Sequence, residues 1–211
     1  MISSKWPLKG LAFAAMASFS ALGSALTIDF YSTNVLTGPG IAAGVPVLSV
    51  TITDSAPDEV SVTVFNNAPL GTTQTVKTLW LNVDPYPASL RGGSGDSHVD
   101  SINWGATADT QGAPMGLTFD VKIEFKTGGS TRIPAQDSSL FTLTGSGLDE
   151  SDFFTGTPQD ADILGVAHVI STVGNEESVH LYAVPEPASI AGMLLGFGAV
   201  AARRARKKNS A

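Results

Sequence analysis

The acidic side chains of this 211-residue chain have the clearest capacity for binding chemistry. Two close groups stand out, Asp-Glu-Ser-Asp at residues 149–152 and Asp-Ala-Asp at residues 160–162. Calcium takes about six to eight oxygen ligands, and closely spaced loop carboxylates can supply several of them. Neither group has the third ligand, glycine and terminal glutamate of an EF-hand loop. These acidic groups therefore have two interpretations. They bind one structural calcium ion, or they form a solvated acidic face near a helix N-terminus. The candidate ligands are Asp149, Asp152, Asp160 and Asp162.

The three histidines are the other side chains that could ligate a metal. His168 and His180 fall in runs with apolar neighbours, where a lone histidine is more often a half-buried strand residue than a ligand. His98 alternates with Asp96 and Asp100, a pattern that could hold a metal but that ordinary loop polarity explains better. We therefore predict no metal site on the histidines.

No pattern in the chain supports catalysis. The absence of cysteine excludes a thiolate nucleophile and a thiolate zinc site. Gly-x-Ser-x-Gly, a phosphate-binding loop and His-Glu-x-x-His are all missing. The carboxylate pair of a glycoside hydrolase assembles in space and leaves no local motif, so a hydrolase remains a distant alternative. We expect no enzymatic activity and no cofactor.

The aromatic residues raise the alternative of sugar binding. Trp80 and Trp104, together with Tyr86, could stack on sugar rings from a sheet face or its loops. If Leu79 and Leu81 face the core, Trp80 points outward or into a second layer. The core position is favoured for Trp80, because large aromatic residues dominate the cores of β-sandwiches.

The charge of the chain is unevenly distributed. Residues 26–184 hold five Lys or Arg against 18 Asp or Glu, a formal charge of −13, whereas the whole chain has −7. Phosphate binding requires a basic surface, so nucleic acid is excluded as a partner.

The spacing of apolar residues predicts strands. Alternation, with Val, Ile, Thr and Phe prominent, marks seven strands, and an eighth run is more continuously apolar. These are residues 26–31, 47–53, 60–65, 79–83, 117–125, 140–143, 163–170 and 179–182. Turns are expected at residues 54–57, 92–95, 128–129 and 145–147, and one helical turn at residues 149–154 with Asp149 near its N-cap. The predicted fold class is all-β, a single antiparallel, jelly-roll-like β-sandwich over residues 26–184.

The N-terminus predicts a secretory signal peptide over residues 1–25. Lys5 and Lys9 precede an apolar run, Leu11–Leu22, that is too short to span a bilayer. Small residues then lead to a cleavage site between Ala25 and Leu26. Secretion machinery and signal peptidase are the implied partners; a buried first helix is the alternative.

The C-terminus, residues 185–211, has three consecutive parts. Val184-Pro185-Glu186-Pro187 is followed by an uncharged stretch, Ala188–Ala202, and a basic end. The stretch would extend roughly 22 Å as a helix, which is short for a membrane span, and snorkelling and local thinning of the bilayer close part of the gap. We predict a single transmembrane helix with a cytoplasmic C-terminus. The basic residues are Arg203, Arg204, Arg206, Lys207 and Lys208.

This order of a Pro-Glu-Pro box, an apolar helix and an Arg-rich end resembles the PEP-CTERM sorting signal. The resemblance implies recognition of Val184–Pro187 by an exosortase, a membrane-embedded transpeptidase, after transient anchoring in the inner membrane. It implies delivery to the cell surface or an extracellular polymer matrix. A structural or matrix role is then the leading expectation, and a module that binds exopolysaccharide is the alternative. A permanent anchor behind a Pro-rich stalk stays open.

The body also resembles those of other PEP-CTERM proteins, although this resemblance implies no activity. Its elements are a Trp-x-Asn-x-Asp strand (Trp80, Asn82, Asp84), a Phe-Thr-Leu-Thr-Gly strand at residues 141–145 and an Ala-His-Val strand at residues 167–169.

Overall fold

The computed structural model describes residues 25–38, 46–105, 109–128, 131–170 and 178–184. The predicted signal peptide up to residue 24 lies outside the described residues. So do Pro185–Pro187, the predicted membrane helix and the basic end. Within the described ranges, no helix is both long enough and apolar enough to cross a membrane.

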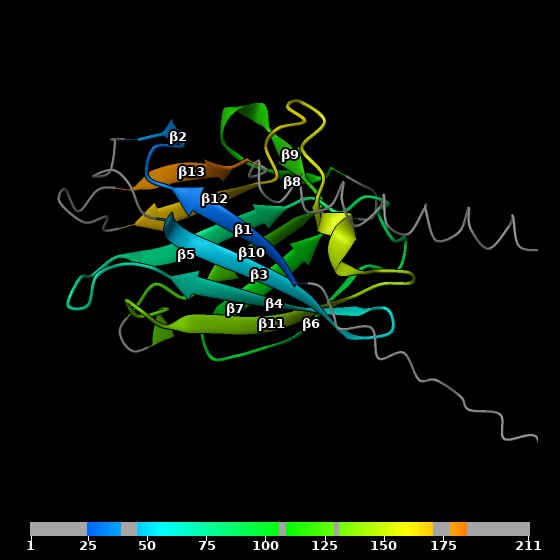
Figure 1. Cartoon of the computed structure of the whole chain (residues 1–211), viewed down its shortest axis with the longest axis horizontal. Helices are drawn as coiled ribbons and strands as arrows, with labels where there is room; N and C mark the ends of the chain where they lie inside the picture. The colour runs from blue at the N-terminus through cyan, green and yellow to red at the C-terminus, as the bar shows by residue number, and fades with distance from the viewer. Residues whose placement is uncertain (1–24, 39–45, 106–108, 129–130, 171–177, 185–211) are drawn as a thin grey trace, which may run out of the picture.

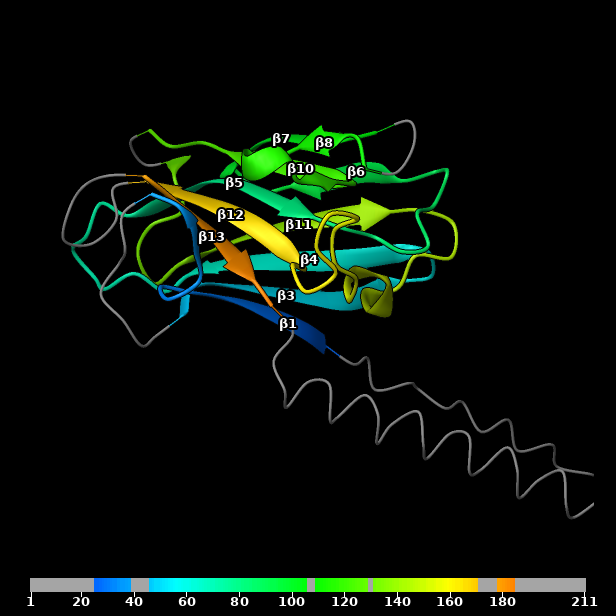
Figure 2. The ribbon, with the colours of Figure 1, turned by 90° about the horizontal axis from the view of Figure 1, so that it is seen from above.

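Two antiparallel sheets pack face to face, as the views in Figure 1 and Figure 2 show. The first has the order β1-β3-β4-β11-β6 and the second the order β2-β13-β12-β5-β10-β7. Strands of the first sheet are β1 (Ala25–Tyr31), β3 (Pro46–Ala56), β4 (Glu59–Asn66), β11 (Ser138–Thr144) and β6 (Arg91–Gly95). Strands of the second are β2 (Val35–Thr37), β13 (Val179–Ala183), β12 (Gly165–Ile170), β5 (Thr75–Leu81), β10 (Val121–Phe125) and β7 (Val99–Trp104). The all-β prediction is confirmed.

Period-two patterning explains how these strands share one core. Along β1 and β4, buried and more exposed residues alternate, so each strand turns one row of side chains toward the opposite sheet. Phe30 and Val62 from the first sheet join Leu79 and Ile123 from the second in the main core. Strand β5 is buried on both faces along most of its length, because its outer side is covered as well.

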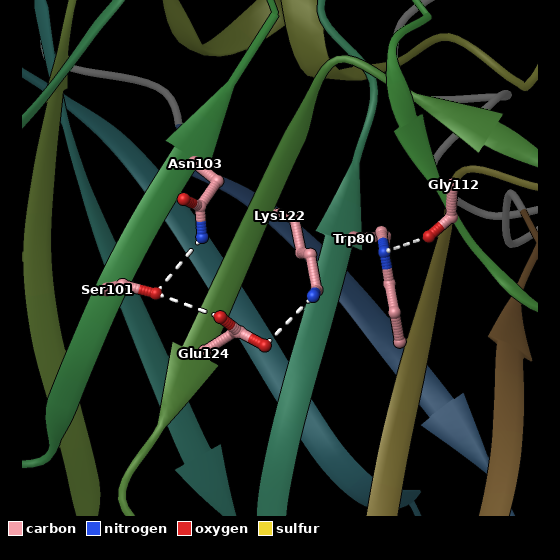
Figure 3. Close-up of polar contacts among 6 residues, drawn as sticks. All are labelled: Trp80, Ser101, Asn103, Gly112, Lys122 and Glu124. Carbon is pink, nitrogen blue, oxygen red and sulfur yellow. Dashed lines mark hydrogen bonds and ion pairs between the residues drawn. The ribbon is translucent and has the colours of Figure 1, made fainter.

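A second, smaller cluster covers the outer face of the second sheet. Trp80 lies there with Phe119 and Val166, and it is only 6% exposed. Its indole Nε1 donates a hydrogen bond of 3.0 Å to the carbonyl of Gly112, as Figure 3 shows. Gly112 belongs to a small hairpin of β8 (Gln111–Gly112) and β9 (Thr118–Phe119), joined through a short 3-10 helix, η1 (Pro114–Gly116). Trp80 therefore occupies a second layer.

The predicted turn at residues 92–95 is wrong, because these residues form strand β6. The neighbouring strand β7 was not predicted either. A Cβ on Gly92 would come within 2.8 Å of the Cβ of Ile102, and one on Gly95 within 2.9 Å of the Cβ of Val99. The glycines therefore let the edges of the two sheets approach closely, which is a strand role rather than a turn role.

The predicted helical turn is confirmed as η3 (Glu150–Phe153). The side chain of Asp149 accepts a hydrogen bond of 2.8 Å from the backbone N–H of Ser151. The side chain of Asp152 accepts one of 3.1 Å from the backbone N–H of Asp149. This capping box satisfies backbone donors that a helix start leaves unpaired. The predicted strand at residues 117–125 is also present, but Asp120 divides it into β9 and β10.

Candidate functional site

The first and the last strands of the sandwich have their outer ends on the same side of the molecule. Strand β1 starts at Ala25, which pairs with Thr53, and β13 ends at Ala183, which pairs with Gly165. At this side, η3 connects the two sheets through two hydrogen bonds. The backbone N–H of Glu150 donates to Asp54 Oδ1 at 3.0 Å, and the backbone N–H of Asp84 donates to the carbonyl of Asp152 at 2.9 Å. Because β13 ends here, the chain continues toward the Pro-Glu-Pro box from this end.

This end carries most of the body's described carboxylates, and we call it the acidic end. Its members are Asp54, Asp58, Glu59, Asp84, Asp109, Asp120, Asp149, Glu150, Asp152, Asp160 and Asp162. Burial, together with the neighbouring like charges, raises the pKa of two of these carboxyls. Burial, together with the neighbouring carboxyl of Asp54, raises the pKa of Glu150 to about 7. Burial and the charges on Asp149, Asp84 and Asp54 likewise raise the pKa of Asp152.

The four predicted calcium ligands form two local arrangements at the acidic end. Asp149 and Asp152 cap η3. Asp160 closes a turn with Thr157, and its carboxylate accepts a hydrogen bond of 3.0 Å from the backbone N–H of Asp162. Across the described residues, no three His, Cys, Asp or Glu side chains are grouped closely enough to hold a metal ion.

A cavity of about 230 Å³ opens beside these turns. Its walls come from the end of β5, the segment before β10 and the segment that follows η3. The residues lining it are Asn82, Val83, Asp84, Tyr86, Asp109, Asp120, Thr155, Gly156, Thr157 and Pro158. Three carboxylates and no cationic side chain are found among these lining residues.

Asp120 is the buried carboxylate of the cavity, with an exposed fraction of 3%. Its Oδ2 accepts a hydrogen bond of 2.8 Å from the backbone N–H of Val83, and its Oδ1 one of 2.7 Å from that of Asp109. Burial raises the pKa of Asp120, these two hydrogen bonds lower it, and the charges on Asp109 and Asp84 raise it again, so the net shift is upward.

Asn82 contributes an unusual group to the same cavity. The residue is 2% exposed, and its Nδ2 donates a hydrogen bond of 2.6 Å to the carbonyl of Gly156. Its Oδ1 is buried, and no group among the described residues donates a hydrogen bond to it. A buried acceptor without a donor costs free energy and calls for an explanation.

In the sequence, Asn82 and Asp84 stand out only as part of a strand motif, and Asp109 and Asp120 were not predicted as site residues. Asp120 stands at a polar position of the alternating run 117–125, as the partly exposed Glu124 does, so the pattern alone does not mark Asp120 as buried. Asp109 carries no signal either, since it stands alone in a polar loop.

His168 and His180 are neighbours in space rather than lone strand residues. They face each other across β12 and β13, and their rings stack with centroids 4.2 Å apart. The Nδ1 of His180 lies 2.9 Å from the hydroxyl of Thr37. Burial, the neighbouring His180 and Lys77 lower the pKa of His168 to about 4. Burial and Lys77 also lower the pKa of His180. His98 is separate, with its Nδ1 2.9 Å from the carbonyl of Thr131.

This histidine pair predicts a sensitivity to acid. Since the pKa of His168 falls from 6.5 to about 4 on folding, the unfolded chain binds a proton more readily than the folded chain. The resulting stability is present above pH 6.5 and is lost as the pH falls toward 4.

We expect His168→Phe in the full-length chain to reduce the drop in melting temperature between about pH 7 and about pH 5. His98→Gln is the matched control, and an equal drop in both variants would contradict the prediction. Far-UV circular dichroism in mild detergent provides the measurement.

Trp104, unlike Trp80, borders an open groove. The groove, of about 340 Å³, lies between β6 and β7 and is lined by Gly92, Gly93, Gly95, Asp96, Val99, Asp100, Ser101, Ile102 and Trp104. The guanidinium of Arg91 lies 6.0 Å from the centroid of the Trp104 ring. Asp96 is held rigidly by hydrogen bonds from the backbone N–H groups of His98 and Leu140 and from the hydroxyl of Ser139. Burial acts to raise its pKa, but these hydrogen bonds outweigh burial and lower the pKa.

The outer face of the second sheet beside Trp80 is polar, as Figure 3 shows. Lys122 forms an ion pair of 2.8 Å with Glu124, which also accepts a hydrogen bond of 3.0 Å from Ser101. Asn103 continues the row by donating to Ser101. The bond from Lys122, followed by that from Ser101, lowers the pKa of Glu124. The contact between Ser101 and Glu124 joins β7 to β10, and such a cross-strand pair stabilises the pairing of the two strands.

Comparison with known proteins identifies the C-terminal end of the chain. The family model of the PEP-CTERM protein-sorting motif matches residues 183–207. A search of curated proteins and a search of solved structures found no match to the chain. The matched residues begin at Ala183, the last residue of β13, so the motif follows directly on the sandwich. The chain therefore carries a PEP-CTERM sorting motif at its C-terminal end, and this motif supports export, processing by an exosortase and delivery to the cell surface.

Proposed function

We propose that the sandwich is a structural component of the cell surface or of the extracellular polymer matrix, to which the sorting motif delivers it. The single observation that carries this proposal is the position of the motif, immediately after the last strand of a well-packed β-sandwich. The strongly acidic body supports it, since like charge keeps such a body soluble and away from anionic surfaces during export.

The proposed route has four steps. The signal peptide is removed after Ala25, which leaves Leu26–Tyr31 of β1 in the mature chain. The apolar stretch Ala188–Ala202 then anchors the exported body, with Arg203 and its basic neighbours on the cytoplasmic side. The exosortase cuts near Pro185–Pro187, and the body passes to the surface.

A second candidate function is binding of a matrix polysaccharide. The groove between β6 and β7 favours it, because it combines the partly buried ring of Trp104 with the carboxylates of Asp96 and Asp100. Sugars present apolar ring faces that stack on aromatic rings and hydroxyls that donate to carboxylates. Trp80 is not part of this candidate site, since it is packed beneath the β8–β9 hairpin.

One experiment tests the proposal and separates the two functions. In the producing cell, a chain ending at Val184 should be secreted into the medium rather than kept at the surface, and the matrix should lose cohesion. For a structural role, the released body should not co-sediment with isolated matrix polysaccharide. For a sugar-binding role, it should co-sediment, and Trp104→Ala should abolish this while Asn103→Ala, at the exposed neighbouring position of β7 outside the groove lining, should not. Retention of the truncated chain at the surface would contradict delivery by the motif.

A further inference from the structure

We propose that the cavity lined by Asn82, Asp84, Asp109 and Asp120 binds a calcium ion. This site is distinct from the two acidic groups at residues 149–152 and 160–162. Its lining brings three aspartates together with no Lys, Arg or His side chain. Uncompensated carboxylates at one cavity favour the entry of a cation, because the ion removes their mutual repulsion.

The orphaned oxygen of Asn82 is the second, independent observation. Nδ2 is fixed by its hydrogen bond of 2.6 Å to the carbonyl of Gly156, so the other amide atom is assigned as the oxygen. That Oδ1 is buried and has no donor among the described groups. A bound cation would satisfy it, since the amide oxygen of asparagine is an ordinary calcium ligand. The unsatisfied acceptor therefore gains a partner when the ion binds.

Asp120 is preorganised for the same role. Its two oxygens are oriented by the backbone N–H groups of Val83 and Asp109, 2.8 and 2.7 Å away. Each carboxylate oxygen has two lone pairs, so each keeps one that can face a cation. An oriented carboxylate and an oriented amide oxygen at the base of the cavity reduce the conformational entropy that metal binding would otherwise cost.

The remaining ligands come from the rim of the cavity. Thr155, Gly156 and Thr157 line its wall, and their main-chain carbonyls are further oxygen ligands of the kind that calcium takes. A set of carboxylate, amide and carbonyl oxygens suits a hard cation rather than zinc or copper. Calcium fits such an irregular and adjustable set better than magnesium, which demands near-octahedral geometry.

Ion binding requires a movement of Asp84, the exposed aspartate of the three. The three carboxylates do not already form a compact metal cluster. Asp84 is exposed and Asp109 half-buried, so the side chain of Asp84 can turn inward by a change of rotamer. The bound ion would then connect the end of β5, the start of β10 and the segment after η3. It would stabilise the end of the sandwich from which the sorting motif leaves.

The test measures calcium binding to the full-length chain in mild detergent. Titration calorimetry should give a Kd of about 10⁻⁴ to 10⁻³ M, the range of extracellular calcium modules. Calcium should raise the melting temperature, because a ligand that binds the folded state stabilises it. Asp84→Asn and Asp109→Asn should each weaken binding at least about tenfold. Asp162→Asn is the matched control, since it removes one charge from the acidic end without touching the cavity.

Three results would overturn the proposal. The first is no calorimetric signal and no change in melting temperature at millimolar calcium. The second is an equal rise in melting temperature with magnesium, which indicates general screening of charge. The third is unchanged affinity in both Asp84→Asn and Asp109→Asn. Circular dichroism of the ion-free variants verifies that each is folded.

Discussion

Replacement of Pro185-Glu186-Pro187 with three alanines is expected to leave the exported chain uncut in the inner membrane. Proline lacks a backbone N–H, fixes φ and pushes the residue before it toward extended conformations. Alanine is the best helix former, so the substituted segment would extend the apolar helix outward. A processing enzyme that needs an extended peptide would then lose its substrate. We expect an all-or-none change, with the full-length chain in the membrane fraction and the body missing from the surface.

The control for this prediction replaces residues on the far side of the membrane helix. Substituting both Asn209 and Ser210 by alanine alters the end of the chain and leaves the box intact. Its processing should match that of the native chain. If the substituted box were processed like the native one, the box would be a passive stalk. Immunoblots of membrane, surface and medium fractions distinguish the cases by the mobility of the chain.

Asn66→Ala is expected to destabilise the sandwich strongly. Asn66, at the end of β4, has an exposed fraction of 0%. Its Nδ2 donates to the carbonyls of Gln74 and Ile133, at 3.0 and 3.2 Å. Its Oδ1 accepts from the backbone N–H of Ala68 and from the side chain of Gln74, at 3.1 and 3.3 Å. One amide thus joins the end of β4 to the segments before β5 and before β11.

Truncation to alanine would leave several buried polar groups without a partner. Each such group costs about 1–3 kcal/mol, so the free energy of unfolding should fall by about 3 kcal/mol or more. That loss is a large part of the roughly 5–15 kcal/mol that stabilises a typical domain. Urea denaturation of the full-length chain in mild detergent, followed by circular dichroism, measures the change.

Asn67→Ala is the matched control for Asn66→Ala. The neighbouring Asn67 is half-buried, and its side chain donates to the hydroxyl of Ser49 at 2.9 Å. Its removal should cost only about 0.5–1.5 kcal/mol, the net value of one ordinary hydrogen bond. Similar losses for the two variants would show that the Asn66 network is not a major source of stability.

Much of the sandwich could be predicted from the sequence, because alternation reports one buried face. Strands β1, β4 and β11 are half-buried, so polar and apolar residues alternate and their positions were predicted. The capped turn at Asp149 was predicted because its signal is also local. Strand β6 was not predicted because three of its five residues are glycines, and a segment so rich in glycine is typical of a turn. Their role depends on Ile102, Val99 and Trp104 in another sheet, which no local pattern reveals.

The candidate site was predicted less well than the fold, for a related physical reason. The acidic groups that are close in sequence, at residues 149–152 and 160–162, mainly organise their own turns. The cavity instead combines Asn82, Asp109 and Asp120 with residues 155–158, which are far apart along the chain. The histidine pair is similar, since the register of β12 against β13 brings His168 opposite His180. Sorting was predictable because a processing enzyme recognises a contiguous linear segment.

The most direct test of the sorting account is the mass of the protein recovered from the cell surface or the matrix. Mass spectrometry of the intact protein and of its peptides should find a chain that starts at Leu26. It should end near Pro185–Pro187 and include no peptide from Arg203–Ala211. A surface protein that retains Arg203–Ala211 would contradict processing and would make the C-terminal segment a permanent anchor.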